Sequence, residues 1–395
     1  MPRSLPIVLT NSELNTWRSC PHRWGLEYED GLRPKVEAQP LRWGNMFHEG
    51  AAAGWELAAA TDVTLPEVIE TARARLDEYV TAYLAELPDS DNADEIRDEA
   101  HTDFDGVQWS LGHYFESVKH DLEKTVIAVE LKFDPFRVPN SKGTARGSWI
   151  HYGGKLDLVL WDPMMQRIEI QDHKGTGASI DTFERKMELD TQMTGYLMAV
   201  RHLLKTGQLK HPDVPADAWK RTGLIQHNVI RRKLPGQPKL NKLTKKQCVS
   251  MRHRQLFDRQ ETNGEPQGLV SVAQCDTLAG VYLQALKEQA YDRELPPTQA
   301  QSDMAERLTS RGDTFFGQFS FMRDDDEVER WRKEVWVHGR HIRAAKKNPL
   351  ERTRNPGACS LATSPRCPYA AVCQSNDTAT RMDFRIAKQR HEELA

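Results

Sequence analysis

Residues 151–174, HYGGKLDLVLWDPMMQRIEIQDHK, constrain the fold more than any other stretch of the chain. A run over 156–161 that is apolar except for Asp157 is followed by the turn signal Asp162-Pro163 and then by alternating polar and apolar residues over 167–173. This pattern predicts two strands with a tight connection, and therefore a hairpin near the centre of the chain.

Three charged residues of this hairpin suggest chemistry. Asp157 lies in the first strand, and Asp172 and Lys174 lie at the end of the second. Side chains at i and i+2 of a strand share a face, so Asp172 and Lys174 point the same way, and Asp157 can join them if the strands pair. Two carboxylates and an ammonium group could hold a divalent cation beside a nucleophilic water. A hairpin with a solvated charged face explains the same residues, and this stretch alone does not decide between the two.

The composition is that of a soluble globular protein. The chain has 395 residues, of which 38% are hydrophobic and 28% charged, and this length suits one large domain or two. No apolar run is long enough to span a bilayer, and residues 5–9 are too short for a signal sequence, so we expect a cytoplasmic protein without a membrane partner. The net charge of −3 means that nucleic-acid binding would depend on local basic patches.

The first third of the chain reads as helices that lead into a strand. Residues 11–30 predict a helix with a break near Pro21, and residues 41–60 predict an Ala-rich helix that begins near Gly44 and carries His48. Helical periodicity continues over 65–87 and 92–124. Thr125–Phe133 predicts a strand whose one acidic residue is Glu130, either a surface residue or a neighbour of a metal.

The segment after the hairpin predicts a helix with a polar face and then a basic stretch. Residues 181–204 predict one long helix on which Gln192 and Tyr196, four apart, share a face. Residues 221–232 predict a strand whose end opens a basic stretch that begins with Arg231, Arg232 and Lys233. Such a stretch is either a solvated loop or an arm that contacts phosphates. Helices over 268–292, 298–310 and 325–347 and a strand over 314–321 complete the prediction.

Three of the six cysteines, Cys359, Cys367 and Cys373, lie within fifteen residues and predict a ligand cluster, because disulfides are unlikely in the cytoplasm. A zinc site usually has two Cys-x-x-Cys pairs, and this segment has none. Cys248 and Cys275 have no motif partners, and we interpret both as structural.

Taken in order, the motifs resemble the PD-(D/E)XK nuclease superfamily, in its RecB-like branch of iron–sulfur exonucleases linked to CRISPR adaptation and end resection. The motifs are Cys20, Gly44-x-x-x-His48, Glu130, Gly-Lys-Leu-Asp157, Asp172-His-Lys174, Gln192-x-x-x-Tyr196 and the three C-terminal cysteines. The resemblance implies an α/β fold with a restriction-endonuclease-like core, a mixed sheet flanked by helices, together with helical additions and a C-terminal Fe–S segment. It divides the chain into 1–125, 126–232 and 233–395, all parts of one composite nuclease domain.

The resemblance also implies roles for these residues. Mg²⁺ or Mn²⁺ would be held by His48, Asp157, Asp172, the backbone carbonyl of His173 and, as an open question, Glu130, while Lys174 would assist the attacking water and stabilise charge. Gln192 and Tyr196 would position DNA. Cys20, Cys359, Cys367 and Cys373 would bind one [4Fe–4S] cluster. The spacing from Cys359 to Cys367 is longer than that of the family, which keeps zinc as the alternative.

The implied function is metal-dependent hydrolysis of DNA, as an exonuclease on single-stranded or duplex ends, in recombination, repair or end processing and with proteins of those pathways as partners. The alternative is a catalytically inactive DNA-binding or assembly protein that keeps the nuclease fold and is stabilised by zinc.

Overall fold

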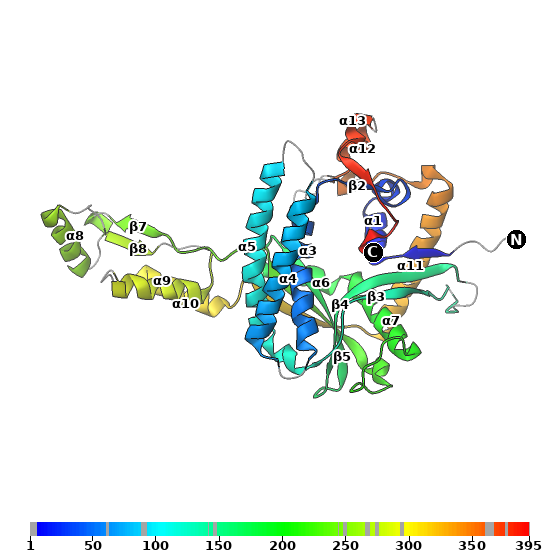
Figure 1. The fold of residues 1–395 in the computed structure, drawn as a ribbon, viewed down its shortest axis with the longest axis horizontal. Coiled ribbons are helices and arrows are strands. Elements are labelled where there is room, and N and C mark those ends of the chain that lie inside the picture. The colour runs from blue at the N-terminus through cyan, green and yellow to red at the C-terminus, as the bar shows by residue number, and fades with distance from the viewer. Residues whose placement is uncertain are drawn as a thin grey trace. The chain divides into compact units, whose positions relative to one another are not determined.

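A computed structural model describes residues 6–60, 63–87, 93–140, 142–144, 148–243, 245–247, 251–264, 269–272, 276–292, 296–359, 367–375 and 378–394 (Figure 1). The chain forms two compact units. The first comprises Met1–Lys174, Glu184–Asn228 and Gln318–Ala395, and the second comprises Gly175–Phe183 and Val229–Gly317.

A six-stranded mixed sheet runs through the fold, with the order β1-β4-β5-β6-β9 and with β3 also paired to β4. The strands are β1 (Ile7–Leu9), β3 (Thr125–Arg137), β4 (Ile150–Asp162), β5 (Arg167–Thr176), β6 (Thr222–Arg231) and β9 (Phe316–Met322). The predicted hairpin is confirmed as β4 and β5, which pair antiparallel from Asp162–Arg167 to Leu158–Gln171. In its turn, Asp162 Oδ1 accepts hydrogen bonds from the backbone N–H groups of Met164 and Met165.

Strand β4 uses its two edges differently. One edge pairs with β3 over most of its length, whereas the other pairs with β1 at Ile150–Tyr152 and with β5 only from Leu158 onward. The ladder between β4 and β5 therefore ends one residue before Asp157 and Asp172. Both acidic residues lie where backbone pairing stops, so their side chains and the neighbouring N–H groups are available to one another.

Helices cover both faces of the sheet. Helices α3 (Gln39–Ala58), α4 (Leu65–Glu86) and α5 (Ala93–Ser117) lie side by side, followed by a 3₁₀ turn at Lys119–Glu123 (Figure 1). On the other face, apolar residues of α7 (Thr191–Thr206) and α11 (Asp325–Lys347) share one core with Ile168 and Ile170 of β5. Helix α3 begins at Gln39, five residues before the predicted start. Pro40 fits its first turn, because the N–H group that proline lacks would have no acceptor within the helix at that position.

Two predicted helices are corrected. Residues 181–204 form two helices, α6 (Ile180–Glu188) and α7, because Asp190 has an extended backbone and its side chain caps α7 by accepting a hydrogen bond from the N–H of Gln192 at 2.8 Å. The segment 268–292 holds a strand, β8 (Leu269–Val272), before the helix α9 (Ala279–Asp292). The apolar run of β8 is so short that periodicity does not distinguish a strand from the first turn of a helix.

The N-terminal and C-terminal segments of the first unit pack together. Helices α1 (Asn11–Ser19) and α2 (Pro21–Trp24) and a π-helical turn at Gly25–Glu29 lead to β2 (Leu32–Pro34), which pairs antiparallel with β10 (Phe384–Ile386). Leu26, Leu32, Tyr369 and Val372 form a small core beside helix α12 (Ala370–Gln374), which helix α13 (Thr378–Arg381) follows.

The described residues of the second unit include a two-stranded sheet and three helices. Strand β7 (Leu240–Leu243) pairs antiparallel with β8, and helices α8 (Met251–Asn263), α9 and α10 (Gln299–Arg311) accompany them.

Short 3₁₀ turns occur at Ala218–Arg221, Lys245–Gln247, Pro349–Glu351, Pro356–Ala358 and Glu392–Leu394. In the described part of the chain, no helix has the length and apolar character that crossing a bilayer requires.

Candidate active site

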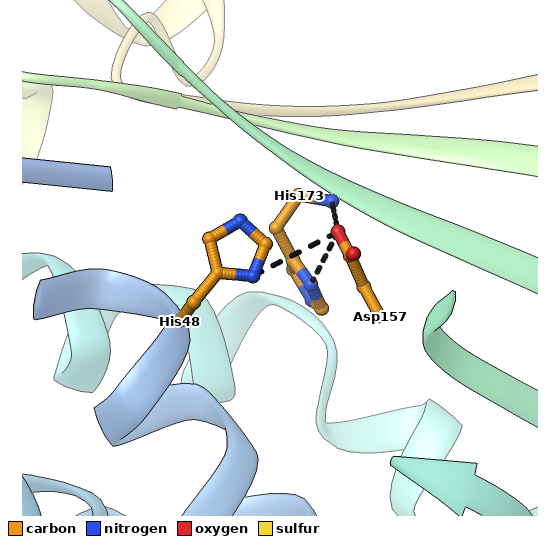
Figure 2. Close-up of side chains that lie close together, drawn as sticks. All are labelled: His48, Asp157 and His173. Carbon is orange, nitrogen blue, oxygen red and sulfur yellow. Dashed lines mark hydrogen bonds and ion pairs between the residues drawn. The ribbon is translucent and has the colours of Figure 1, made fainter. Parts of the chain in front are cut away.

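His48, Asp157 and His173 converge at the open end of the β4–β5 ladder (Figure 2). One potential ligand atom from each lies within 4.8 Å of the others. Asp157 Oδ2 accepts a hydrogen bond from the backbone N–H of His173 at 2.9 Å and lies 3.8 Å from Nδ1 of both His48 and His173. The carboxylate thus accepts a hydrogen bond from β5 where the backbone pairing of β4 and β5 has ended, and it lies between two imidazoles.

Glu130 of β3 completes this side of the site. Its Oε1 lies 2.8 Å from Nδ1 of His48, and its Oε2 forms an ion pair with Nζ of Lys155. Its backbone has a φ of 45°, in the left-handed region that non-glycine residues rarely adopt, in the middle of a strand. The flanking pairs Val129–Leu158 and Leu131–Leu156 place Glu130 opposite Asp157. Glu130, for which the sequence left a surface position and a place beside a metal equally open, therefore lies against His48 and Lys155, and Lys155 is an additional cation that sequence reasoning missed.

Asp172 and Lys174 point to the same face, as the strand alternation predicted, with Lys174 Nζ 3.1 Å from Asp172 Oδ2. Two further residues bind the Asp172 carboxylate: Gln192 of α7 donates to Oδ1 at 3.2 Å, and His227 of β6 places Nδ1 3.3 Å from Oδ2. His173 points to the opposite face, where Nε2 lies 2.7 Å from the hydroxyl of Tyr114 on α5.

His227 and Tyr114 were also missed by sequence reasoning. Both are fully buried, and Trp55 donates to the Tyr114 hydroxyl at 2.9 Å, so each adjoins a site residue from within the core. Neither residue belongs to a recognisable motif, and both lie in segments with many other polar side chains, so the sequence gives no signal that would single them out.

Burial and charge set the protonation of the site. Burial disfavours the imidazolium of His48, but the carboxylates of Asp157 and Glu130 outweigh it and raise the pKa of His48 to about 9. Burial raises the pKa of Asp157 to about 6, with the Asp172 charge adding to the shift and His48 opposing it. Burial and the positive charge of His48 lower the pKa of His173 to about 3.

The D-x-K pair is held in its charged form. Burial acts against ionisation of both groups, but Lys174 and His227 keep the pKa of Asp172 well below its usual range. The carboxylates of Asp172 and Asp157 likewise raise the pKa of Lys174. Lys174 is thus a cation at neutral pH, and Asp172 is an anion.

The donor set suits a divalent cation. Two imidazoles and a carboxylate are close together, Asp172 lies near enough for its charge to act on Asp157, and His173 Nδ1 is buried without a hydrogen-bond partner among the described residues. Nitrogen donors favour Mn²⁺ over Mg²⁺, whereas the carboxylates suit both.

A family model described as the PD-(D/E)XK nuclease superfamily matches residues 8–374. The chain belongs to the PD-(D/E)XK nuclease superfamily. Members are generally nucleases that use Mg²⁺ or Mn²⁺, and the mixed sheet flanked by helices fits their fold. No curated protein matches the chain significantly.

Within this PD-(D/E)XK fold, Gln192 and Tyr196 lie on one face of α7 as predicted. Gln192 Nε2 donates to the Tyr196 hydroxyl at 2.7 Å, and Lys174 Nζ donates to Gln192 Oε1 at 3.1 Å. Gln192 therefore bridges both charged members of the D-x-K motif, and the Tyr196 ring belongs to the core.

The predicted basic contacts lie in the second unit. Arg231 and Lys233 form ion pairs with Asp276, at 2.7 and 3.2 Å, and the backbone N–H of Arg232 donates to the carbonyl of Thr176. The positive charges of Arg231 and Lys233 are thus partly neutralised by Asp276, which belongs to the same unit.

The four predicted cluster ligands, Cys20, Cys359, Cys367 and Cys373, are all free thiols in the first unit. Burial raises the pKa of the Cys367 thiol, and the nearby Cys359 and Cys20 add to this shift. The segments that carry them are joined: Asn355 donates to the carbonyl of Ser19 at 2.7 Å, and Tyr369 donates to the carbonyl of Leu32 at 3.0 Å. Cys248 and Cys275 lie outside the described residues.

Proposed function

We propose that this protein is a metal-dependent DNA nuclease that acts as an exonuclease on single-stranded or duplex ends during recombination, repair or end processing. The observation that carries the proposal is the contact of Lys174 with Asp172 at 3.1 Å beside the imidazole–carboxylate group of His48, Asp157 and His173. A protein that kept only the fold would have no need to hold charged and buried side chains together in this way.

His48, Asp157 and Asp172 would hold Mg²⁺ or Mn²⁺, with the backbone carbonyl of His173 as a further ligand and Glu130 held against His48. The His173 imidazole, with its buried and unbonded Nδ1, is a further donor on the other face of the strand. When bound, the cation would supply Lewis-acid charge that offsets the negative charge of the scissile phosphate.

Lys174 would act through its charge. Since the surrounding carboxylates raise its pKa, it carries a proton at neutral pH and stabilises negative charge that develops on the phosphate. In the reaction, a water oxygen bonds to phosphorus and releases a proton, the bond to one ester oxygen breaks, and that leaving oxygen takes up a proton in balance. Gln192 would keep the ammonium and the carboxylate aligned through its two hydrogen bonds.

Cys20, Cys359, Cys367 and Cys373 would bind one [4Fe–4S] cluster with a structural role, since hydrolysis moves no electrons. The joined N-terminal and C-terminal segments support this assignment, because a cluster there would clasp α1 and α2 onto the chain end. Zinc at the same thiols is the alternative.

The test is incubation of the purified protein with end-labelled linear DNA and with circular DNA, in Mn²⁺ or in EDTA. We expect Mn²⁺-dependent release of nucleotides from linear DNA and intact circles, and loss of cleavage by about 10²-fold or more in Lys174→Ala. Lys210→Ala, at an exposed lysine of the same unit, is the matched control. Cleavage of circles would indicate an endonuclease, and a wild-type rate in Lys174→Ala would refute the active site. DNA binding without any cleavage would favour the inactive, nuclease-fold alternative.

A further inference from the structure

We infer that the second unit, through residues 229–317, is a DNA-backbone-binding module that determines the affinity of the enzyme for its substrate. The inference rests on the proposed function for the identity of the polyanion, which is DNA. It adds to that function a division of roles, in which the first unit holds the hydrolytic site and the second unit supplies phosphate contacts.

The module is an insertion between two strands of the sheet. The chain leaves through β6 and returns through β9, which are neighbours in the sheet. The backbone N–H of Arg231 donates to the carbonyl of Phe315 at 2.9 Å, so both ends of the insertion lie side by side. The Arg231 guanidinium lies over the Phe315 ring, 5.1 Å from its centroid, and bonds to Asp276. These contacts close the module at its base.

The module has a core of its own. Tyr282 and Leu286 of α9 pack with Ala305 and Leu308 of α10 and with Val272 of β8. The edge of the small sheet is tied to the helices, because the N–H of Val272 donates to Gln289 Oε1 at 2.6 Å and its carbonyl accepts from Gln301 Nε2 at 2.7 Å. The insertion is therefore a folded body, which a long solvated loop would not be.

The module differs from the rest of the chain in its net charge. Residues 229–317 contain 14 lysines and arginines against 10 aspartates and glutamates, whereas the whole chain has a net charge of −3. Nine of these cations fall within 231–254, a stretch with no acidic residue. An acidic protein that binds DNA must concentrate its phosphate contacts locally, and no other folded unit here has a positive balance.

Five cations of this stretch fall into two groups by their ion pairs. Arg231 and Lys233 are paired with Asp276, and Lys245 is paired with Asp258 at 2.7 Å. By contrast, Lys239, Lys246 and the nearby Arg259 are exposed and have no ion-pair partner among the described residues. These three side chains can exchange water for phosphate without breaking an existing ion pair, so we assign the first phosphate contacts to them.

The test uses the full chain with Lys239→Gln, Lys246→Gln and Arg259→Gln combined. The matched control combines Lys119→Gln, Lys210→Gln and Lys347→Gln, three exposed lysines of the first unit. Binding to a short fluorescein-labelled DNA duplex is measured by anisotropy in EDTA over a series of salt concentrations, and cleavage in Mn²⁺ is measured separately.

We expect the module variant to bind about tenfold or more weakly at 0.1 M salt, with the slope of log K against log salt reduced by about 0.9 for each lost contact. The control should match the wild type. Cleavage at saturating DNA should be unchanged in the module variant, with a raised KM. Equal binding and equal salt slopes in the module variant and the wild type would overturn the inference. Binding that depends on the module without any cleavage would overturn the proposed hydrolysis and leave the inference standing.

Discussion

Nδ1 of His227 lies 3.3 Å from Oδ2 of Asp172, which brings a fully buried imidazole against the carboxylate of the D-x-K motif. Lys174 Nζ contacts the same Oδ2, so two nitrogen atoms from different strands hold one carboxylate oxygen. His227 Nε2 is buried without a hydrogen-bond partner in the described part of the chain, and the ring touches Phe321. His227 therefore orients Asp172 from the core and is a positioning residue.

Replacing His227 should weaken the site indirectly, because Asp172 would lose a residue that orients it. In His227→Leu we expect the affinity for Mn²⁺ and the cleavage rate each to fall by about 10-fold to 100-fold, as is common when the partner of a metal ligand is lost. His227→Asn should recover part of both, because its amide N–H can stand near the position of Nδ1. Calorimetric titration with Mn²⁺ measures the affinity, and His101→Leu, at an exposed histidine of α5, is the control. Wild-type affinity in His227→Leu would reduce the residue to packing.

Loss of the α7 contacts should be milder than loss of Lys174. Gln192→Ala removes both bonds that align the D-x-K pair, so we expect cleavage to drop by about tenfold, and Tyr196→Phe removes one hydroxyl bond of about 1 kcal/mol, a fewfold effect. Tyr196→Phe should leave the affinity for Mn²⁺ unchanged, because its hydroxyl bonds to Gln192 and to no expected ligand, whereas Gln192→Ala should lower it, because Gln192 donates to Oδ1 of Asp172. Single-turnover cleavage measures both variants, and rates equal to that of the wild type would make α7 a scaffold only.

Acid should destabilise the first unit through His338 on α11. Arg18 Nε donates to His338 Nε2 at 3.2 Å, and burial together with the Arg18 charge lowers the pKa of His338 to about 4. The unfolded imidazole titrates near ~6.5, so the unfolded state binds more protons between the two values, and stability falls as the pH drops through that window. The expected loss at pH ~5 is on the order of 1 kcal/mol, because solvent screens a half-buried group.

Urea denaturation near pH ~7.5 and ~5 measures this difference in the free energy of unfolding. His338→Gln keeps an acceptor for Arg18 but does not titrate, so its unfolding should depend less on pH. His101→Gln, at an exposed histidine of α5, should behave like the wild type. An unchanged pH dependence in His338→Gln would show that other groups cause the acid sensitivity.

The cysteine assignment has a clean substitution. Cys20 Sγ accepts a hydrogen bond from the N–H of Arg23 at 3.5 Å and caps α2. Serine caps a helix at least as well, so Cys20→Ser should remove the thiolate and keep the cap. We expect the anaerobically purified wild type to be brown, to absorb near ~400 nm and to hold about four irons, and the variant to be colourless and prone to aggregation.

Cys248→Ser and Cys275→Ser are the controls and should remain brown. Bleaching of either would mean that a different set of cysteines binds the cluster. A colourless wild type that contains one zinc would refute the cluster and leave the nuclease assignment intact, since no cysteine belongs to the D-x-K site.

Local patterns were enough for the parts of this protein that depend on neighbours in sequence. The shared face of Asp172 and Lys174 follows from strand alternation, and that of Gln192 and Tyr196 from the helical repeat, so both were predicted and both are observed. The order of the short motifs likewise indicated the superfamily, which the family model confirms.

Tertiary structure decided what depends on contacts between distant segments. His227 reaches Asp172 only because β6 pairs beside β5, 55 residues farther along the chain, and Lys155 meets Glu130 only because β3 and β4 are in that register. The break in the long predicted helix is local by contrast, because α6 ends at Glu188 and the Asp190 side chain caps α7 by accepting from the N–H of Gln192, but only the packing of α7 sets Gln192 against Lys174. Periodicity records which face a side chain occupies, whereas the partner on that face is chosen by strand register and helix packing, which no local pattern encodes.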